Sequence, residues 1–188
     1  MHKFNPINKK KLDNEWRREV FPPKKTLELL GIEKNDTIAD IGCGIGYFTI
    51  PAAEIVDINN RIYGLDISQE MLDEVEIKAE SLGIKNITNV KTDEYDLKLP
   101  DNSVSFGLMV NVLHEIEDKE RLLKEINRIT KENGKLAIIE WKKKETKMGP
   151  PVHHRISKDE VIKLCQNNNL NVEKEFEWAD SFYGVVVS

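Results

Sequence analysis

The chain has 188 residues, 39% of them hydrophobic and 32% charged, and its formal net charge at pH 7 is −5. This length and composition are typical of a single soluble domain with its own hydrophobic core. The acidic balance provides no general electrostatic attraction to nucleic acid or to an anionic membrane. No apolar run approaches the roughly 20 residues of a membrane span, and the polar start lacks the apolar region of a signal peptide. We therefore expect one cytoplasmic domain over residues 1–188, with residues 1–25 as an N-terminal segment.

The first half of the chain alternates predicted helices and strands. Pro22-Pro23 open a helix-like stretch that ends at Gly31. Ser68 is the predicted N-cap of a helix with apolar residues at helical spacing as far as Leu82. A shorter helix is predicted with Pro51 in its first turn, where proline is tolerated. Three β-rich runs predict strands over residues 37–42, 61–67 and 86–92.

The second half continues this alternation and ends differently. An apolar run over residues 104–113 is typical of a buried parallel strand. An amphipathic helix is predicted over residues 118–134, with Gly134 as its stop. Ser157 and Glu160 form a capping-box pattern at the start of the last helix. Further strands are predicted over residues 135–141, 170–178 and 181–188, with loop chemistry over 142–156.

This order of elements predicts an α/β fold. Alternating strands and helices indicate a doubly wound, mostly parallel sheet of seven strands that is covered on both faces. The short connection between the last two strands indicates a hairpin, so we expect one edge strand to be antiparallel. Cys43 and Cys165 are the two cysteines, and two thiols in a chain of this length do not indicate a disulfide framework.

A glycine-rich turn carries the functional signal. The stretch from Asp40 to Gly46 follows a predicted strand and opens a helix, as a nucleotide-binding turn requires. Gly42 permits the tight turn, and Gly44 and Gly46 let the backbone approach a ligand closely. Asp66 ends the next strand, where a carboxylate can accept hydrogen bonds from both hydroxyls of a ribose.

Two other interpretations of this turn remain open at this point. One is a plain strand-to-helix turn, and the other is a dinucleotide site, which normally has a third glycine where this chain has Tyr47. A pyrophosphate would be repelled by Asp40, whereas a cationic amino-acid group would be attracted to it. Asp40 and Asp66 together therefore suit a ligand with a positive end and a ribose but no phosphate.

The sequence resembles the class I S-adenosylmethionine-dependent methyltransferases over most of residues 25–188. The segments IADIGCGIGYF and GLDIS match the family's first motif and the acidic end of its second strand. TDEYDLKLPDNSVSFGLMVNVLHEIED and ITKENGKLAIIEW are similar to two later blocks that are common among small-molecule members. The resemblance, strongest to the quinone-biosynthesis-like subgroup, implies a Rossmann-like fold and one methyltransferase domain.

The resemblance also implies a cofactor, S-adenosyl-L-methionine, and residues that hold it. Asp40 would orient the methionine amino group, Asp66 would hold the ribose hydroxyls, and Asn111 and Val112 would contact the methionine portion. The turn residues implied to line the methionine and ribose are Gly42, Cys43, Gly44 and Gly46. The residues implied to surround the adenine are Ile67, Met71, Asp93 and Glu94.

The implied reaction is an in-line displacement at a sulfonium methyl group, with a small molecule as the acceptor. The cofactor carries the activation, so the protein supplies alignment and exclusion of water. His114 and Glu115 follow the fourth predicted strand and are the candidate catalytic residues. His114 has two interpretations. It either acts as a base or forms a hydrogen bond to the methyl acceptor, or it only shapes the wall of the pocket.

Several other residues have two interpretations each. His153, His154 and Arg155 either cover an anionic acceptor or belong to an exposed polar loop. Trp141 stacks on a flat substrate or anchors the end of a strand. The segment His2–Phe4 either folds over the cofactor as a lid or is a disordered tail. Cys43 lies beside a helix N-terminus that could lower its pKa, but its small size explains it better.

Alternative functions are a methyltransferase acting on RNA or protein, and a non-catalytic protein that binds the cofactor. The acidic charge and the absence of an Asn/Asp-Pro-Pro-aromatic motif after the fourth strand disfavour nucleic acid. Nothing in the histidine spacing demands a metal, so we expect none. The sequence leaves the acceptor, the methylated atom and the oligomeric state open.

Overall fold

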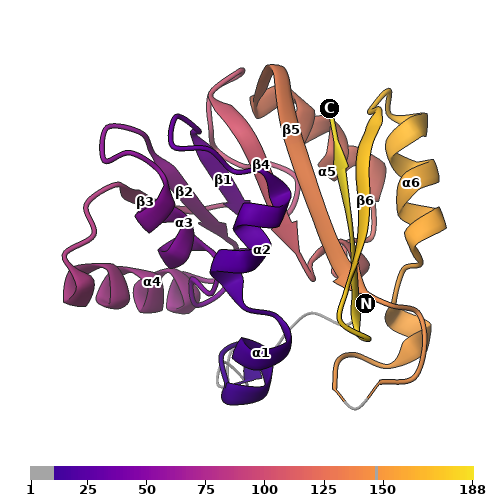
Figure 1. Cartoon of the computed structure of the whole chain (residues 1–188). Coiled ribbons are helices and arrows are strands. Elements are labelled where there is room, and N and C mark those ends of the chain that lie inside the picture. The colour runs from indigo at the N-terminus through magenta and orange to yellow at the C-terminus, as the bar shows by residue number, and fades with distance from the viewer. Residues whose placement is uncertain (1–10, 147) are drawn as a thin grey trace.

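A computed structural model describes residues 11–146 and 148–188. In this part of the chain, seven strands form one sheet in the order β3-β2-β1-β4-β5-β7-β6 (Figure 1). The first five strands are parallel, and β7 is antiparallel to both β5 and β6. The bounds are β1 (Ile38–Ile41), β2 (Ile62–Asp66), β3 (Ile87–Lys91), β4 (Val104–Val110), β5 (Thr130–Trp141), β6 (Val172–Trp178) and β7 (Phe182–Val187).

This topology confirms the predicted Rossmann-like, mostly parallel sheet with a hairpin at one edge. Within this hairpin, β7 lies second from the edge and is antiparallel to both of its neighbours. The edge strand β6 pairs antiparallel with β7 and therefore runs in the same direction as β5.

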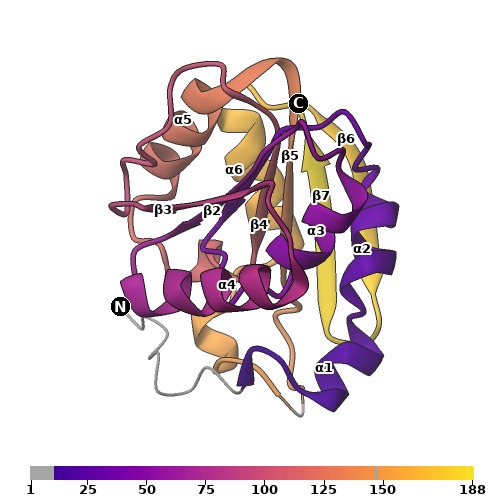
Figure 2. The same cartoon turned by 90° about the vertical axis from the view of Figure 1, so that its left-hand side faces the viewer.

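Helices cover both faces of the sheet. Figure 2 shows α2 and α3 on one side and α5 and α6 on the other. The α-helices are α1 (Glu15–Val20), α2 (Pro23–Leu30), α3 (Thr49–Ile55), α4 (Gln69–Leu82), α5 (Lys119–Ile129) and α6 (Lys158–Asn167), and the short 3-10 helices are η2 (Leu113–Glu115) and η3 (Val152–His154). None of the helices in these described ranges is long and apolar enough to cross a membrane.

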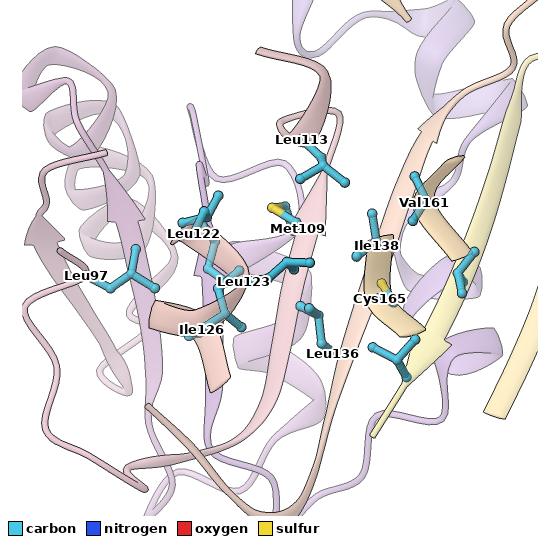
Figure 3. Packing of buried hydrophobic residues seen from close by; sticks show 14 of the residues in the cluster. Leu97, Met109, Leu113, Leu122, Leu123, Ile126, Leu136, Ile138, Val161 and Cys165 are labelled. Carbon is cyan, nitrogen blue, oxygen red and sulfur yellow. The ribbon is translucent and has the colours of Figure 1, made fainter. Parts of the chain in front are cut away.

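The hydrophobic core has two halves that the sheet separates. Leu136 and Ile138 of β5 belong to the half under α5 and α6, whereas Ala137 and Ile139 belong to the half under α2 and α3. This alternation follows from the period of two in a strand. Figure 3 shows the first half, in which Cys165 packs as the sequence predicts.

Local sequence signals predict several boundaries correctly. Gly31 ends α2 in the left-handed conformation, and Ser157 and Glu160 form the predicted capping box. Pro51 lies in the first turn of α3 as expected. Ser68 occupies the N-cap position of α4, but its side chain makes no capping hydrogen bond. Leu82 was expected on the apolar face, but it is 58% exposed.

Two boundaries were predicted wrongly. The helix expected to reach Gly134 ends at Ile129, and the following residues belong to β5. The backbone N–H of Ser103 donates to the carbonyl of Ile129 at 2.8 Å, so a tertiary contact satisfies the end of the helix. The strand expected to reach residue 113 ends at Val110, because Asn111 adopts a φ of 58°.

Candidate active site

A cavity of about 410 Å³ lies at the carboxyl ends of β1, β2 and β4. This is where ligands bind in doubly wound sheets, and the volume is of the size that holds one small ligand. Of the predicted cofactor-binding residues, all but Gly46 line it. Those that do are Asp40, Gly42, Cys43, Gly44, Asp66, Ile67, Met71, Asp93, Glu94, Asn111 and Val112.

The glycine turn has the backbone conformation that the motif predicts. Gly42, Gly44 and Gly46 have φ values of 68°, 53° and 78°, which residues with a Cβ rarely adopt. A Cβ at position 42 would lie 2.5 Å from a methyl carbon of Val112. Gly46 instead faces the Val75 side chain, at 3.2 Å from where its Cβ would lie. The turn therefore brings backbone to the cavity at Gly42 and Gly44, while Gly46 allows close packing of α4.

Asp66 is fixed by the turn it faces. One carboxylate oxygen accepts a hydrogen bond from the N–H of Gly44 at 2.9 Å, and the other accepts from the N–H of Ser68 at 2.8 Å. Burial raises the pKa of Asp66, and these backbone hydrogen bonds oppose the rise. The side chain is thus held rigidly at the cavity wall.

Asp40 is more deeply buried, with 3% of its surface exposed. Its carboxylate accepts a hydrogen bond from the Thr49 hydroxyl at 2.6 Å, a partner that the sequence did not indicate. Burial raises the pKa of Asp40 to about 7, and the neighbouring charge of Asp66 adds to the rise while Thr49 opposes it. A cation in the cavity would favour the ionised form.

Two side chains at the cavity have buried polar atoms without a hydrogen-bond partner. Both side-chain polar atoms of Asn111 are buried without a hydrogen-bond partner, and so is Nε of Arg17. Such atoms are unfavourable unless a ligand satisfies them. Arg17 comes from α1, and its guanidinium lies 4.7 Å from the centre of the Tyr47 ring. Sequence reasoning missed Arg17 because it did not predict α1.

Charge at the cavity is predominantly negative. Among the described lining residues, five are acidic and Arg17 is the basic one. The acidic residues are Asp40, Asp66, Asp93, Glu94 and Glu115. This set suits a ligand with a positive centre and one anionic group, as S-adenosylmethionine has, and it does not suit a diphosphate.

Comparisons with known proteins agree with this geometry. The family model described as a methyltransferase domain matches residues 39–138. The crystal structure of a SAM-dependent methyltransferase from Aquifex aeolicus is 34% identical, and the match covers 98% of each chain with a TM-score of 0.94. The chain belongs to the class I S-adenosylmethionine-dependent methyltransferases. The predicted family, enzyme class and cofactor are thereby confirmed.

Other relatives of this methyltransferase are less complete matches. A demethylmenaquinone methyltransferase of Anoxybacillus flavithermus is 31% identical over 125 residues, which are 66% of this chain and 53% of that protein. The chain thus spans about half the length of the curated relatives it matches. A putative type 11 methyltransferase from Sulfolobus solfataricus is 29% identical, with a TM-score of 0.73 over 89% of this chain and 90% of that chain.

The two candidate catalytic residues of the methyltransferase line different hollows. Glu115 lines the candidate cofactor cavity, whereas His114 lines a second hollow of about 560 Å³. The Nδ1 atom of His114 lies 2.8 Å from a carboxylate oxygen of Glu140, which is fully buried on β5. Sequence reasoning missed Glu140, because one acidic residue in an apolar strand gives no sign of its partner.

The loop after β5 differs from both interpretations made from the sequence. Arg155 is 5% exposed and donates hydrogen bonds to the backbone carbonyls of Lys142, Lys144, Met148 and Pro150. Its donors are thus used to fold the loop rather than to bind an acceptor. His153 is exposed and His154 half-buried, and both line the second hollow.

Trp141 anchors the end of β5 in this methyltransferase. Its ring centre lies 4.3 Å from that of Phe182, and the indole is 7% exposed. Cys43 was considered for a lowered pKa, but burial raises its pKa well above the ordinary value. The side chains described by the structure include no group of three or more His, Cys, Asp or Glu that could hold a metal ion. The segment His2–Phe4 lies outside the described residues.

Proposed function

We propose that this protein transfers the methyl group of S-adenosylmethionine to a low-molecular-weight acceptor. The observation that carries the proposal is the single-ligand cavity lined by the buried carboxyl group of Asp40 and the half-buried one of Asp66, with unsatisfied polar atoms on Asn111 and Arg17. The relatives named demethylmenaquinone methyltransferases favour a quinone-like acceptor. An acceptor bound at the second hollow would lie beside the turn that carries Glu115 and His114.

Each end of the cofactor has a matching group in the proposed complex. Asp66 would hold the ribose hydroxyls with the lone pairs that Gly44 and Ser68 leave available. Asp40 would hold the methionine ammonium group, and Arg17 would pair with its carboxylate. Ile67 and Met71 would enclose the adenine, with Asp93 and Glu94 at its polar edge.

The chain's own contribution to the chemistry is mainly positioning. When bound, the cofactor supplies a methyl group that its sulfonium centre already activates. Asn111, held at the end of β4 by its strained backbone, would orient the methionine portion so that the methyl group faces the acceptor. The buried cavity walls, including Met71 and Leu122, exclude water from the reacting atoms.

Isothermal titration calorimetry with S-adenosylmethionine and S-adenosylhomocysteine tests the cofactor part. Asp66→Ala is expected to weaken both ligands at least tenfold, because it removes the ribose acceptor and loosens the turn. Asp96→Ala is the matched control, since Asp96 lies on the adjacent loop but does not line the cavity. Equal affinities for wild type and Asp66→Ala would show that the ribose binds elsewhere.

The acceptor part is tested with methyl-labelled cofactor. Label should enter a deproteinised small-molecule extract and not purified RNA or protein. Transfer to RNA or protein alone would refute the small-molecule proposal. Cofactor binding without transfer to any of these pools would support a non-catalytic role.

A further inference from the structure

A buried carboxylate and an imidazole form a pair at the border of the cofactor cavity. Both carboxylate oxygens of Glu140 contact His114. One accepts a hydrogen bond from the backbone N–H of His114 at 3.2 Å, and the other lies 2.8 Å from its Nδ1 atom. The side chains are 1% and 7% exposed, so solvent does not compete for this contact. A carboxylate accepts but does not donate when ionised, so the proton of a neutral His114 belongs on Nδ1.

This tautomer leaves the lone pair on Nε2, at the other side of the ring. Nε2 lies 3.8 Å from a carboxylate oxygen of Glu115, which lines the cofactor cavity. The same histidine also lines the second hollow. His114 therefore lines the space available to an acceptor, and its proton-accepting atom lies near a residue that lines the proposed cofactor site.

We infer that His114 is the general base of the reaction and that Glu140 is its positioning residue. The acceptor would then carry a proton, for example on an O–H or N–H group, that is lost to His114 as the methyl group is transferred. This inference rests on the proposed function. It assigns to Glu140 a role that goes beyond packing, because a buried carboxylate that orients an imidazole also stabilises the imidazolium that forms.

The proton and electron balance of the step is simple. The acceptor atom uses a lone pair to form its bond to the methyl carbon, and the electrons of the broken carbon–sulfur bond remain on sulfur. The acceptor's proton moves to Nε2 of His114, and the resulting charge faces Glu140. Solvent removes that proton after the products leave, so no further reactant is required.

The charges around His114 are mixed, and their net effect agrees with this role. Burial lowers the pKa of His114, but the hydrogen bond and charge of Glu140 and the charge of Glu115 outweigh it, so the pKa is raised overall. Arg155 opposes the rise. The other charged or titratable groups that line the hollow beside it are Lys119, Lys143, His153, His154 and Glu160.

The test needs no acceptor, because the two cofactor forms differ by one positive charge. The chain has four histidines, so the ring nitrogens of ¹⁵N-histidine-labelled protein can be followed by NMR as pH is varied, with His114→Gln to assign the signal. If Nε2 faces the methyl group, the positive charge of S-adenosylmethionine should disfavour protonation of His114. The titration midpoint of His114 should then be lower by about half a pH unit or more than with S-adenosylhomocysteine. His153 and His154 are internal controls, whose midpoints should differ less.

Two results would overturn the inference. One is an equal His114 midpoint with both ligands when calorimetry shows that both are bound, and the other is a neutral His114 that carries its proton on Nε2. Glu140→Gln keeps an acceptor oxygen but removes the charge, so it should lower the midpoint in every ligand state. Failure of both ligands to bind would instead refute the proposed function, so the two failures are distinguishable.

Discussion

Asp40→Asn should stabilise the ligand-free protein while weakening its affinity for S-adenosylmethionine. Asp40 is 3% exposed and accepts a hydrogen bond from the Thr49 hydroxyl. An asparagine keeps an acceptor oxygen of nearly the same shape but carries no charge. The substitution therefore removes an ionised group from the interior without opening a cavity.

The size of the expected gain in stability follows from the pKa of Asp40, which rises from its ordinary value of 3.8 to about 7. A carboxyl group with a raised pKa binds its proton more tightly in the folded protein than in the unfolded chain. Its ionisation therefore destabilises the fold increasingly as pH rises from 3.8 to about 7, and by a constant amount above that. The rise corresponds to at most about 4 kcal/mol, and relaxation and water entry should leave about 1–3 kcal/mol.

Thermal unfolding of both proteins at pH 5 and pH 8 is the assay. For a chain of this size, 1 kcal/mol corresponds to about 2–4 °C in Tm. The difference in Tm between Asp40→Asn and the wild type should therefore be several degrees larger at pH 8 than at pH 5. An equal change at both pH values would refute the reasoning, because any effect of packing the new amide is independent of pH.

Three further substitutions test other parts of the structure. Gly42→Ala should lower the free energy of unfolding in urea more than its control Gly83→Ala does. Both glycines have φ near 68°, but only a Cβ at position 42 would contact Val112. The excess should be about 1–3 kcal/mol, and equal costs would argue against the contact. Arg155→Met should remove amide-exchange protection from residues 142–146 and 148–149 without affecting β1, and unchanged protection there would contradict its role. Met109→Ala, fully buried under α5, should cost about 2–5 kcal/mol, and a cost below about 1 kcal/mol would contradict its packing.

The cavity proposed to hold the cofactor was predictable because its determinants are local. Gly42 and Gly44 need left-handed backbone between a strand and a helix, and Asp66 ends the next strand. Parallel strands bring their carboxyl ends to one edge of the sheet, so residues far apart in sequence converge without further information. The turn residues and the carboxylates could therefore be placed from spacing alone.

Glu140 and Arg17 could not be predicted in the same way. Glu140 follows four apolar residues in β5, and its burial depends on a contact with His114, 26 positions earlier. Arg17 belongs to a six-residue helix that Asn14 caps, too short to give a periodic pattern. The roles of both residues depend on tertiary contacts that the sequence does not reveal.

The end of α5 shows why polar segments are ambiguous. Residues 130–134 are polar and end in glycine, which is equally compatible with a final helical turn and with an extended segment. The helix ends at Ile129 because the backbone N–H groups of Asn102 and Ser103 donate hydrogen bonds to the carbonyls of Arg128 and Ile129. Local propensity is nearly balanced there, so distant backbone groups determine the boundary.

The burial that is expected to destabilise the ligand-free fold would also select the proposed ligand. Asp40 and Asp66 both have raised pKa values because burial disfavours their ionised forms, and the charge of Asp66 adds to the rise at Asp40. A cation placed between them relieves this cost, whereas a phosphate would add to it. The proposed preference for a sulfonium nucleoside over a dinucleotide would therefore come from the electrostatics of the cavity as much as from the missing glycine at position 47.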